Sequence, residues 1–435
     1  MKTLVLLGVG STYFTRGIIE SLILKCGEWD VRLVDIDPAC LDIAVNLSRR
    51  LVDLYQAPVR IRGSLERCEV LPGADAVVST IGVGGRRAWE QDVAIFRQFN
   101  VYQSTGDTYG AGGVSRALRM IPVLVDVAHD IERLCPKALF INFSNPMTVN
   151  VRAIAKTSAV RVAGLCYGVT YFQHYLAELI GLPWDQLDCR AIGVNHFTWI
   201  TELSHQGRSV WPLVRQAMER EGSALGNPYT WELFRMFDAF PCVGDGHICE
   251  FIPGWQGEGA YYGQTFGTTF HNFENYAAGF GTVFADMADQ AYGRKPVEKA
   301  VQNPNEKATF KDEDLFIDVL SASLGEASIY RTVNLPNTGQ AANLPRGAVL
   351  EATTRIDGSG FQPLDFGDLP LGITAILQRI LSVQELTVEA ALKADRKLAI
   401  QALVAGETVR TEQEAGRMLD VILDTHRAFL PQFYK

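Results

Sequence analysis

The sequence predicts an α/β protein whose N-terminal part is a Rossmann-type, doubly wound parallel sheet. The first observation is a strand-like apolar run at 3–7 that ends in a glycine turn at 8–11 and continues into an amphipathic helical pattern. The second is a strand at 31–34 that ends in Asp35 and completes a βαβ unit. The third is a series of further short apolar runs separated by helical patterns, which is typical of parallel sheets.

The glycine turn predicts a dinucleotide site. Gly8 and Gly10 let the backbone approach a pyrophosphate, and the helix that starts after Ser11 offers N–H donors and the positive end of its dipole. Asp35 follows about 25 residues after the turn, where an acid binds the ribose hydroxyls and favours NAD over NADP. Tyr13 stands where the third glycine of G-x-G-x-x-G is expected, so an ordinary tight turn stays open as the alternative.

Composition limits the kinds of protein that this chain can be. A length of 435 residues predicts two lobes, or one domain with a large extension. The net charge of −9 argues against a nucleic-acid partner, and no apolar run approaches the roughly 20 residues of a membrane span. The eight cysteines are scattered and form no CxxC pair, which indicates reduced thiols in a cytoplasmic protein.

The remaining elements follow from their patterns. We expect helices at 40–56, 65–71, 115–135, 148–157, 269–294 and 309–324, strands at 59–62, 76–81, 138–142, 160–165 and 190–194, an extended segment with turns at 330–350, and mostly helix from 369 to 430. A glycine loop at 82–85 follows one strand at its carboxyl end, where open α/β sheets bind ligands. Thr80 is therefore a candidate for the cofactor site, with a purely structural loop as the alternative.

Polar side chains follow several of these strands and are candidates for the site. Asp107 lies in a glycine-rich stretch before a long helix, where it could be a catalytic acid or only a helix cap. Asn145 could present its amide to a sugar hydroxyl or to the nicotinamide. Cys166 and His196 each follow a strand and could share a transition metal, although an isolated cysteine usually packs as a small hydrophobic residue.

A glycine-rich loop at 241–255 concentrates three ionisable side chains. Asp245, His247 and Glu250 all lie in it. Two tyrosines, Tyr261 and Tyr262, come soon afterwards.

Six blocks together resemble glycoside hydrolase family 4, the NAD- and divalent-metal-dependent glycosidases. They are the GVGS turn, DTYGAGG at 107–113, NPM at 145–147, GLC at 164–166, GVNH at 193–196 and VNLPNTGQAANLPRGAVLE at 333–351. The resemblance implies a Rossmann domain at 1–195 and a mixed α+β domain at 196–435 that carries the substrate and metal site and the oligomer contacts. This arrangement is similar to that of lactate and malate dehydrogenases, which share the first domain but not the later blocks.

The resemblance also implies a mechanism and its residues. NAD takes hydride from C3 of the sugar, a base removes the C2 proton, the glycosidic oxygen leaves, water adds and the hydride returns. Cys166 and His196 match the ligands of Mn2+ (or another divalent metal), which stabilises the intermediate. Asp107 falls near the leaving group, where it could act as an acid or orient another group. Tyr262 is the first candidate for the base, with Tyr261 and Asp245 as rivals. The expected substrate contacts come from a further group of polar side chains, namely Asn145, Asn195 and His247.

The chain departs from the family pattern at two places. Tyr167 follows the metal cysteine, where the family usually has His, Asn or Asp. Trp89 stands where phospho-sugar members carry an arginine, which favours a non-phosphorylated α-glycoside or α-uronide. A uronide carboxylate would need a cation, for which we consider Arg86, Arg87 and Arg116.

Two other functions compete with a glycosidase. An NAD-dependent 2-hydroxyacid dehydrogenase would form NADH in net amounts and would not need the Cys and His pair. An NAD-sensing binding protein would show neither metal binding nor turnover. For the glycosidase, we expect a small-molecule sugar as substrate and a homodimer or homotetramer, as is common in the family.

Overall fold

The computed structural model describes residues 1–11, 14–25, 27–252, 255, 273–299, 312–407 and 409–434. Tyr261 and Tyr262 lie outside the described residues, so the predicted base stays a prediction.

One sheet of 13 strands runs through the described part of the chain. Six parallel strands form its first half in the order β3-β2-β1-β4-β5-β6, which is the order of a dinucleotide-binding sheet. They are β1 (Lys2–Leu7), β2 (Trp29–Val34), β3 (Val59–Ser64), β4 (Ala76–Ser79), β5 (Leu139–Asn142) and β6 (Arg161–Gly164). The predicted Rossmann half is confirmed, and its strand order reverses between β1 and β4, where such sheets bind ligands.

Antiparallel strands form the other half of this sheet, in the order β10-β8-β7-β12-β11, with β9 paired to β8 and β13 to β12. They are β7 (Leu187–Val194), β8 (Phe197–His205), β9 (Arg208–Ser209), β10 (Phe240–Cys242), β11 (Ile329–Pro336), β12 (Val349–Asp357) and β13 (Gly360–Pro363). β11 joins β6 through the antiparallel pairing of Asn334 with Gly164. The mixed α+β second half is confirmed, whereas the domain boundary at 195 stays a prediction because both halves share one sheet.

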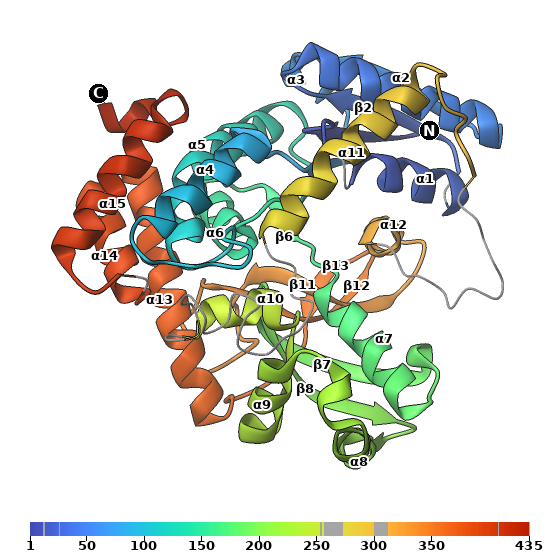
Figure 1. Ribbon diagram of the computed structural model, residues 1–435. Coiled ribbons are helices and arrows are strands. Elements are labelled where there is room, and N and C mark those ends of the chain that lie inside the picture. Colours follow the sequence, from blue (N-terminus) through green and yellow to red (C-terminus); the bar gives the residue numbers. More distant parts are fainter. Residues whose placement is uncertain are drawn as a thin grey trace.

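Helices pack around this sheet and connect its two halves. They are α1 (Thr15–Lys25), α2 (Pro38–Tyr55), α3 (Arg67–Val70), α4 (Gly85–Arg97), α5 (Gly110–Leu134), α6 (Met147–Thr157), α7 (Gly168–Ile180), α8 (Trp211–Glu221), α9 (Pro228–Phe237), α10 (Asp245–Ile248), α11 (Phe273–Ala291), α12 (Asp312–Ser323), α13 (Leu371–Lys393), α14 (Arg396–Ala405) and α15 (Glu412–Thr425). The C-terminal helices α13, α14 and α15 stack beside α4, α5 and α6 and share a buried apolar cluster with them (Figure 1). Within the described ranges, no helix is long and apolar enough to cross a membrane.

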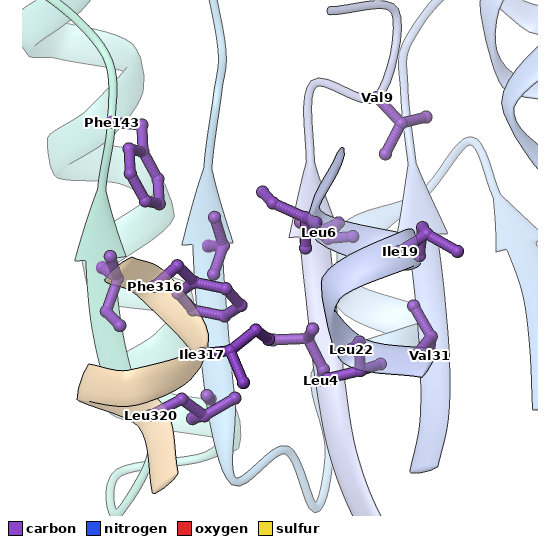
Figure 2. Close-up of a cluster of buried hydrophobic side chains, with 14 of the residues drawn as sticks. Leu4, Leu6, Val9, Ile19, Leu22, Val31, Phe143, Phe316, Ile317 and Leu320 are labelled. Carbon is purple, nitrogen blue, oxygen red and sulfur yellow. The ribbon is translucent and has the colours of Figure 1, made fainter. Parts of the chain in front are cut away.

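The core explains why the parallel strands are apolar on both faces. On one face, Leu4 of β1 lies in one buried cluster with Leu22 of α1 and with Ile317 of α12, a helix that comes from far along the chain (Figure 2). On the other face, Leu124 of α5 joins a cluster with Phe140 of β5. Strands covered by helices on both sides must carry apolar residues at successive positions, and this is the pattern from which the sequence predicts them.

The structure differs from the sequence prediction at two places that matter for function. The segment 241–255, expected to be a loop, contains the end of β10 and the short helix α10. The strand expected at 190–194 is one arm of the β7–β8 hairpin, whose turn contains Asn195 and His196. His196 has a left-handed backbone (φ +66°), a conformation more often taken by Gly, Asn or Asp, so the pattern did not predict the turn.

Candidate active site

The glycine turn has the close backbone packing of a dinucleotide cradle. Gly8 has a φ of +85°, and a Cβ on it would lie 2.8 Å from the Ile81 backbone at the end of β4. A Cβ on Gly10 would lie 3.1 Å from the Cys40 side chain. Thr80 donates its hydroxyl to the Gly8 carbonyl oxygen at 2.8 Å, so it fixes the turn. The turn can therefore pack this closely against Ile81 and Cys40 only because Gly8 and Gly10 lack side chains.

Asp35 and Ser11 also hold this turn in place. Asp35 accepts hydrogen bonds from the Gly10 N–H at 2.8 Å and from the Asp37 N–H at 3.0 Å. Ser11 Oγ accepts the Phe14 N–H at 3.2 Å, just before α1. An ionised carboxylate has about four acceptor positions, so Asp35 keeps capacity for ribose hydroxyls. The cofactor roles of these residues and of Thr80 stay predictions that the geometry fits.

The loop before α5 carries Asp107 and folds tightly onto that helix. A Cβ on Gly112 would lie 2.2 Å from the Gly106 carbonyl oxygen, and one on Gly113 would lie 2.5 Å from that of Thr108. These glycines are thus required for the loop to approach the helix. Asp107 is not the cap of α5, whose N-cap residue is Tyr109. The alternative of a purely capping aspartate therefore does not hold.

Three side chains from distant parts of the chain meet at this loop. Asp107, His196 and His247 each offer a ligand atom, and these atoms all lie within 4.8 Å of one another. The two imidazole rings have centroids 3.9 Å apart. One carboxylate and two imidazoles form a donor set that suits a first-row divalent metal. The structure thus joins the predicted ligand His196 to two residues for which the sequence predicted other roles.

Hydrogen bonding fixes which nitrogen of His196 is available. The Thr108 hydroxyl donates to Asp107 Oδ1 at 2.6 Å, so its single proton is used. The same hydroxyl lies 2.8 Å from His196 Nδ1 and must therefore accept a proton from it. This assigns the Nδ1–H tautomer, which leaves Nε2 with the lone pair that a metal requires. Thr108 therefore orients both Asp107 and His196, and no sequence pattern had pointed to it.

The charge states in this cluster also suit metal binding. Burial raises the pKa of Asp107, but the positive charge of Arg116 and then the neighbouring histidines lower it to about 2. Burial, with a further contribution from His247, lowers the pKa of His196 to about 3. At neutral pH the cluster therefore contains an ionised carboxylate and a neutral His196 imidazole, which are the forms that bind metals.

Cys166 lies on a turn that packs against the segment leading to His247, and it does not belong to the cluster. It follows β6, is partly buried, and its Sγ lies 3.5 Å from the Gly168 N–H. A Cβ on Gly168 would lie 1.6 Å from Val243 Cγ1, so the segment that carries His247 packs directly on this cysteine turn. Cys166 is absent from the group whose ligand atoms lie within 4.8 Å of one another, and its role as a metal ligand stays a prediction.

Asp245 has a structural role in this conformation. Its Oδ1 accepts the Thr230 N–H at 2.8 Å and the Thr230 hydroxyl at 2.7 Å, and its Oδ2 accepts the Tyr229 N–H at 3.0 Å. It is fully buried and ties α10 to the start of α9. These contacts favour a role in positioning His247, two residues later, and the role of Asp245 as the base stays an untested prediction.

Asn195 and Asn145 occupy different places around the cluster. Asn195 is fully buried, and its Nδ2 donates to Glu351 Oε2 at 3.2 Å, which favours a positioning role behind His196. Asn145 Nδ2 donates to Asp107 Oδ2 at 2.9 Å, so it directly contacts a member of the cluster. Their contacts with substrate stay predictions. Glu351, the partner of Asn195, was not among the residues predicted for the site. It is the last residue of the 333–351 sequence block, and its place in that block could have pointed to it.

Glu250 holds the loop that carries Asp107. Its Oε1 accepts the Thr105 N–H at 2.7 Å and the Gly106 N–H at 2.8 Å. Burial raises the pKa of this carboxyl to about 8. Glu250 therefore carries a proton at neutral pH while one oxygen still accepts two backbone hydrogen bonds.

Glu250→Gln should change how stability depends on pH. The unfolded carboxyl ionises above about pH 4.5, whereas the folded one keeps its proton to about pH 8, so wild-type stability falls as pH rises through this window. Gln keeps the acceptor oxygen and cannot ionise. The melting temperature of the variant minus that of wild type should therefore increase from pH 5 to pH 8. Glu132→Gln is a matched control, because Glu132 is exposed and also accepts a backbone N–H, that of Ala159. A difference in melting temperature between Glu250→Gln and wild type that stays constant from pH 5 to 8 would contradict the raised pKa of Glu250.

Fold and site together define a class: a Rossmann-sheet protein with a carboxylate and imidazole cluster near the carboxyl ends of its parallel strands. Two family models then match nearly the whole chain, that of family 4 glycosyl hydrolases at residues 3–182 and that of their C-terminal domain at residues 191–409. The chain belongs to glycosyl hydrolase family 4, so the predicted resemblance is confirmed and the chain is a glycosidase of this family.

Two similar proteins come from Bacillus subtilis strain 168. The chain is 29% identical over 374 residues to an alpha-galacturonidase, with 81% of each chain covered. It is 27% identical over 450 residues to an alpha-galactosidase, with both chains fully covered.

Solved structures show the same fold. A Bacillus subtilis protein assigned as a glucosidase matches with a TM-score of 0.87 and 25% identity, covering 97% of this chain and all of that one. A 6-phospho-alpha-glucosidase from gut microorganisms, crystallised with NAD and Mn2+, matches with a TM-score of 0.83 and 18% identity, covering 98% of each chain. A malate dehydrogenase from Plasmodium falciparum matches with a TM-score of 0.52 and 14% identity, covering 92% of this chain and all of that one. This match supports the predicted similarity of fold to malate dehydrogenases.

Proposed function

We propose that this glycosidase depends on NAD and on a divalent metal such as Mn2+, and that it cleaves a non-phosphorylated α-glycoside or α-uronide. The bond breaks by elimination after oxidation at C3 and loss of the C2 proton. Relatives that act on alpha-galacturonides and alpha-galactosides support the substrate, and the related structure with NAD and Mn2+ supports the cofactors. The cytoplasmic location and the homodimer or homotetramer stay predictions.

The cluster of Asp107, His196 and His247 is the observation that carries this proposal. A glycosidase that uses two carboxylates needs a second acid facing the first across the scissile bond, about 5–10 Å away. Among the described residues, the two acids that flank His247 on its own segment, Asp245 and Glu250, are bonded to backbone N–H groups. A carboxylate with two imidazoles suits metal-assisted chemistry instead.

The chain's own residues would position the reacting groups. Asp107, His196 and His247 would hold the metal, with Cys166 as a further candidate ligand, and the glycine turn with Asp35 would hold the dinucleotide. When bound, these groups supply a hydride acceptor and a Lewis acid for neighbouring sugar oxygens. Thr108 fixes the orientation of both Asp107 and His196 through its hydroxyl, and Asn145 fixes the second oxygen of Asp107.

Hydrolysis of a panel of 4-nitrophenyl glycosides tests the proposal. The panel contains α-glucoside, α-galactoside, α-glucuronide, α-galacturonide and 6-phospho forms, each with and without NAD, Mn2+ and reductant. We expect cleavage of a non-phosphorylated α-glycoside or α-uronide only when both cofactors are present, without net accumulation of NADH. Net NADH formation with a hydroxy acid and no glycoside cleavage would instead indicate a 2-hydroxyacid dehydrogenase. Cleavage without NAD would contradict the mechanism.

A further inference from the structure

Arg116 is a partly buried cation beside the metal-type cluster. It lies in the second turn of α5, and its Nε donates to the Asn145 carbonyl oxygen at 3.1 Å. A Cβ on Gly82, at the carboxyl end of β4, would lie 3.9 Å from Arg116 Nη2. The guanidinium therefore lies between the carboxyl ends of β4 and β5. Ligands of open α/β sheets bind at this end of the strands.

The charge of Arg116 has no bonded acid among the described residues. Among the described residues, the Arg116 side chain makes one hydrogen bond. It runs from Nε to a neutral carbonyl oxygen, that of Asn145. Asp107 is close enough for its charge to interact with that of Arg116. The oxygens of Asp107, however, accept hydrogen bonds from Thr108 and Asn145 and none from Arg116. A partly buried guanidinium without a bonded anion is destabilising, and Asp107 would be shared with a metal when one is bound.

Arg119, one helical turn further along α5, shows what a satisfied arginine looks like here. Its two terminal nitrogens donate to the two oxygens of Asp92, at 3.1 and 2.7 Å. The other two arginines that the sequence offered as anion sites are exposed on α4, and Arg86 is paired with Glu90. Of the three candidates Arg86, Arg87 and Arg116, Arg116 is thus the one that lies in the site, and it has no hydrogen bond to an acid among the described residues.

We propose that Arg116 binds the C6 carboxylate of the substrate, so that the substrate is an α-uronide such as an α-galacturonide. This inference rests on the proposed glycosidase function and narrows its substrate class. The two Nη groups of a guanidinium match the two oxygens of a carboxylate, and one cation balances one negative charge. A neutral hydroxymethyl group would leave the cation unpaired, and a phosphate monoester would bring a second negative charge that this single cation does not balance.

The test compares charged and neutral sugars on the enzyme loaded with NAD and Mn2+. In wild type, kcat/KM for 4-nitrophenyl α-galacturonide should exceed that for the α-galactoside. Arg116→Met should lower kcat/KM for the galacturonide by about 10²–10³-fold, because one partner of a buried charge pair is lost. The same variant should lower kcat/KM for the galactoside by a clearly smaller factor, because losing the charge beside Asp107 affects both sugars whereas losing the carboxylate partner affects only the galacturonide. Arg87→Met, which removes an exposed cation from α4, is the matched control and should leave the preference unchanged.

Binding measurements separate the other outcomes. Calorimetry should show that free galacturonate binds wild type more tightly than galactose or galactose 6-phosphate does, and that Arg116→Met removes this difference without weakening NAD binding. Equal losses on both glycosides, loss of NAD binding, or tighter binding of galactose 6-phosphate would each overturn the inference. If Arg116→Met does not fold, Arg116→Lys keeps the charge without the planar fork and should show a smaller loss on the galacturonide alone. Cleavage of the galactoside but not the galacturonide by wild type refutes this inference alone, whereas no cofactor-dependent cleavage of any glycoside refutes the proposed function.

Discussion

Replacing His196 with Gln should abolish tight Mn2+ binding and slow glycoside hydrolysis by about 10³-fold or more, because a bound Lewis acid contributes several kcal/mol to catalysis. His196 is buried, its Nδ1–H is held by Thr108, and its Nε2 is left with a lone pair beside Asp107 and His247. Mn2+ affinity can be measured directly from the electron paramagnetic resonance signal of the free ion, without relying on turnover.

His205→Gln is the matched control for this experiment. His205 ends the same strand, β8, before which His196 lies, but it is near the surface and bonds Gln186. Its replacement should leave Mn2+ binding unchanged. Unaltered Mn2+ affinity in His196→Gln would show that the cluster is not a metal site.

The same titration assigns the remaining ligands. His247→Gln should weaken Mn2+ binding if the geometric group of Asp107, His196 and His247 is the ligand set. Cys166→Ser should weaken it if the family resemblance gives the correct ligand. A loss in both variants would mean that the cysteine moves into the group when the metal binds.

Asp92→Ala should lower the free energy of unfolding by about 3–5 kcal/mol, since it leaves a buried guanidinium without its acid. Asp92 on α4 is fully buried and accepts hydrogen bonds from Arg119 of α5, from Ser115 of α5 and from His426 after α15. One carboxylate thus joins three segments, including the C-terminal end of the chain. The loss should appear as a lower melting temperature and a lower denaturant midpoint.

The pH dependence of this contribution has a definite sign. Burial raises the pKa of Asp92, but the hydrogen bond with His426 and the charge of Arg119 outweigh it, so the pKa lies below its usual value. The stabilisation is therefore present above the ordinary carboxyl range near pH 4 and is lost as pH falls below it. Asp424→Ala removes an exposed ion pair with Arg427 and should change stability by less than about 0.5 kcal/mol. A similar small effect of Asp92→Ala would contradict the role of the buried pair.

The sequence alone determined the Rossmann half and the family. The strands of a doubly wound sheet are apolar along their length because helices cover both faces, and the glycine turn and Asp35 are close together along the chain. Local patterns of this kind require no knowledge of long-range contacts. The sequence blocks that resemble the family extend into the second half, so the resemblance could be recognised even where the elements themselves were placed less well, as at 241–255.

Only the tertiary structure decided which side chains meet and which oxygens and nitrogens remain available. Asp107, His196 and His247 come from a loop, a hairpin turn and a short helix that no local pattern brings together. Asp245 and His247 are two residues apart, yet one is bonded to backbone N–H groups and the other contacts His196. Arg116 and Arg119 likewise differ by one helical turn, and the acid that neutralises Arg119 lies on another helix. Charge pairing and side-chain direction depend on these long-range contacts, which the order of residues along the chain does not reveal.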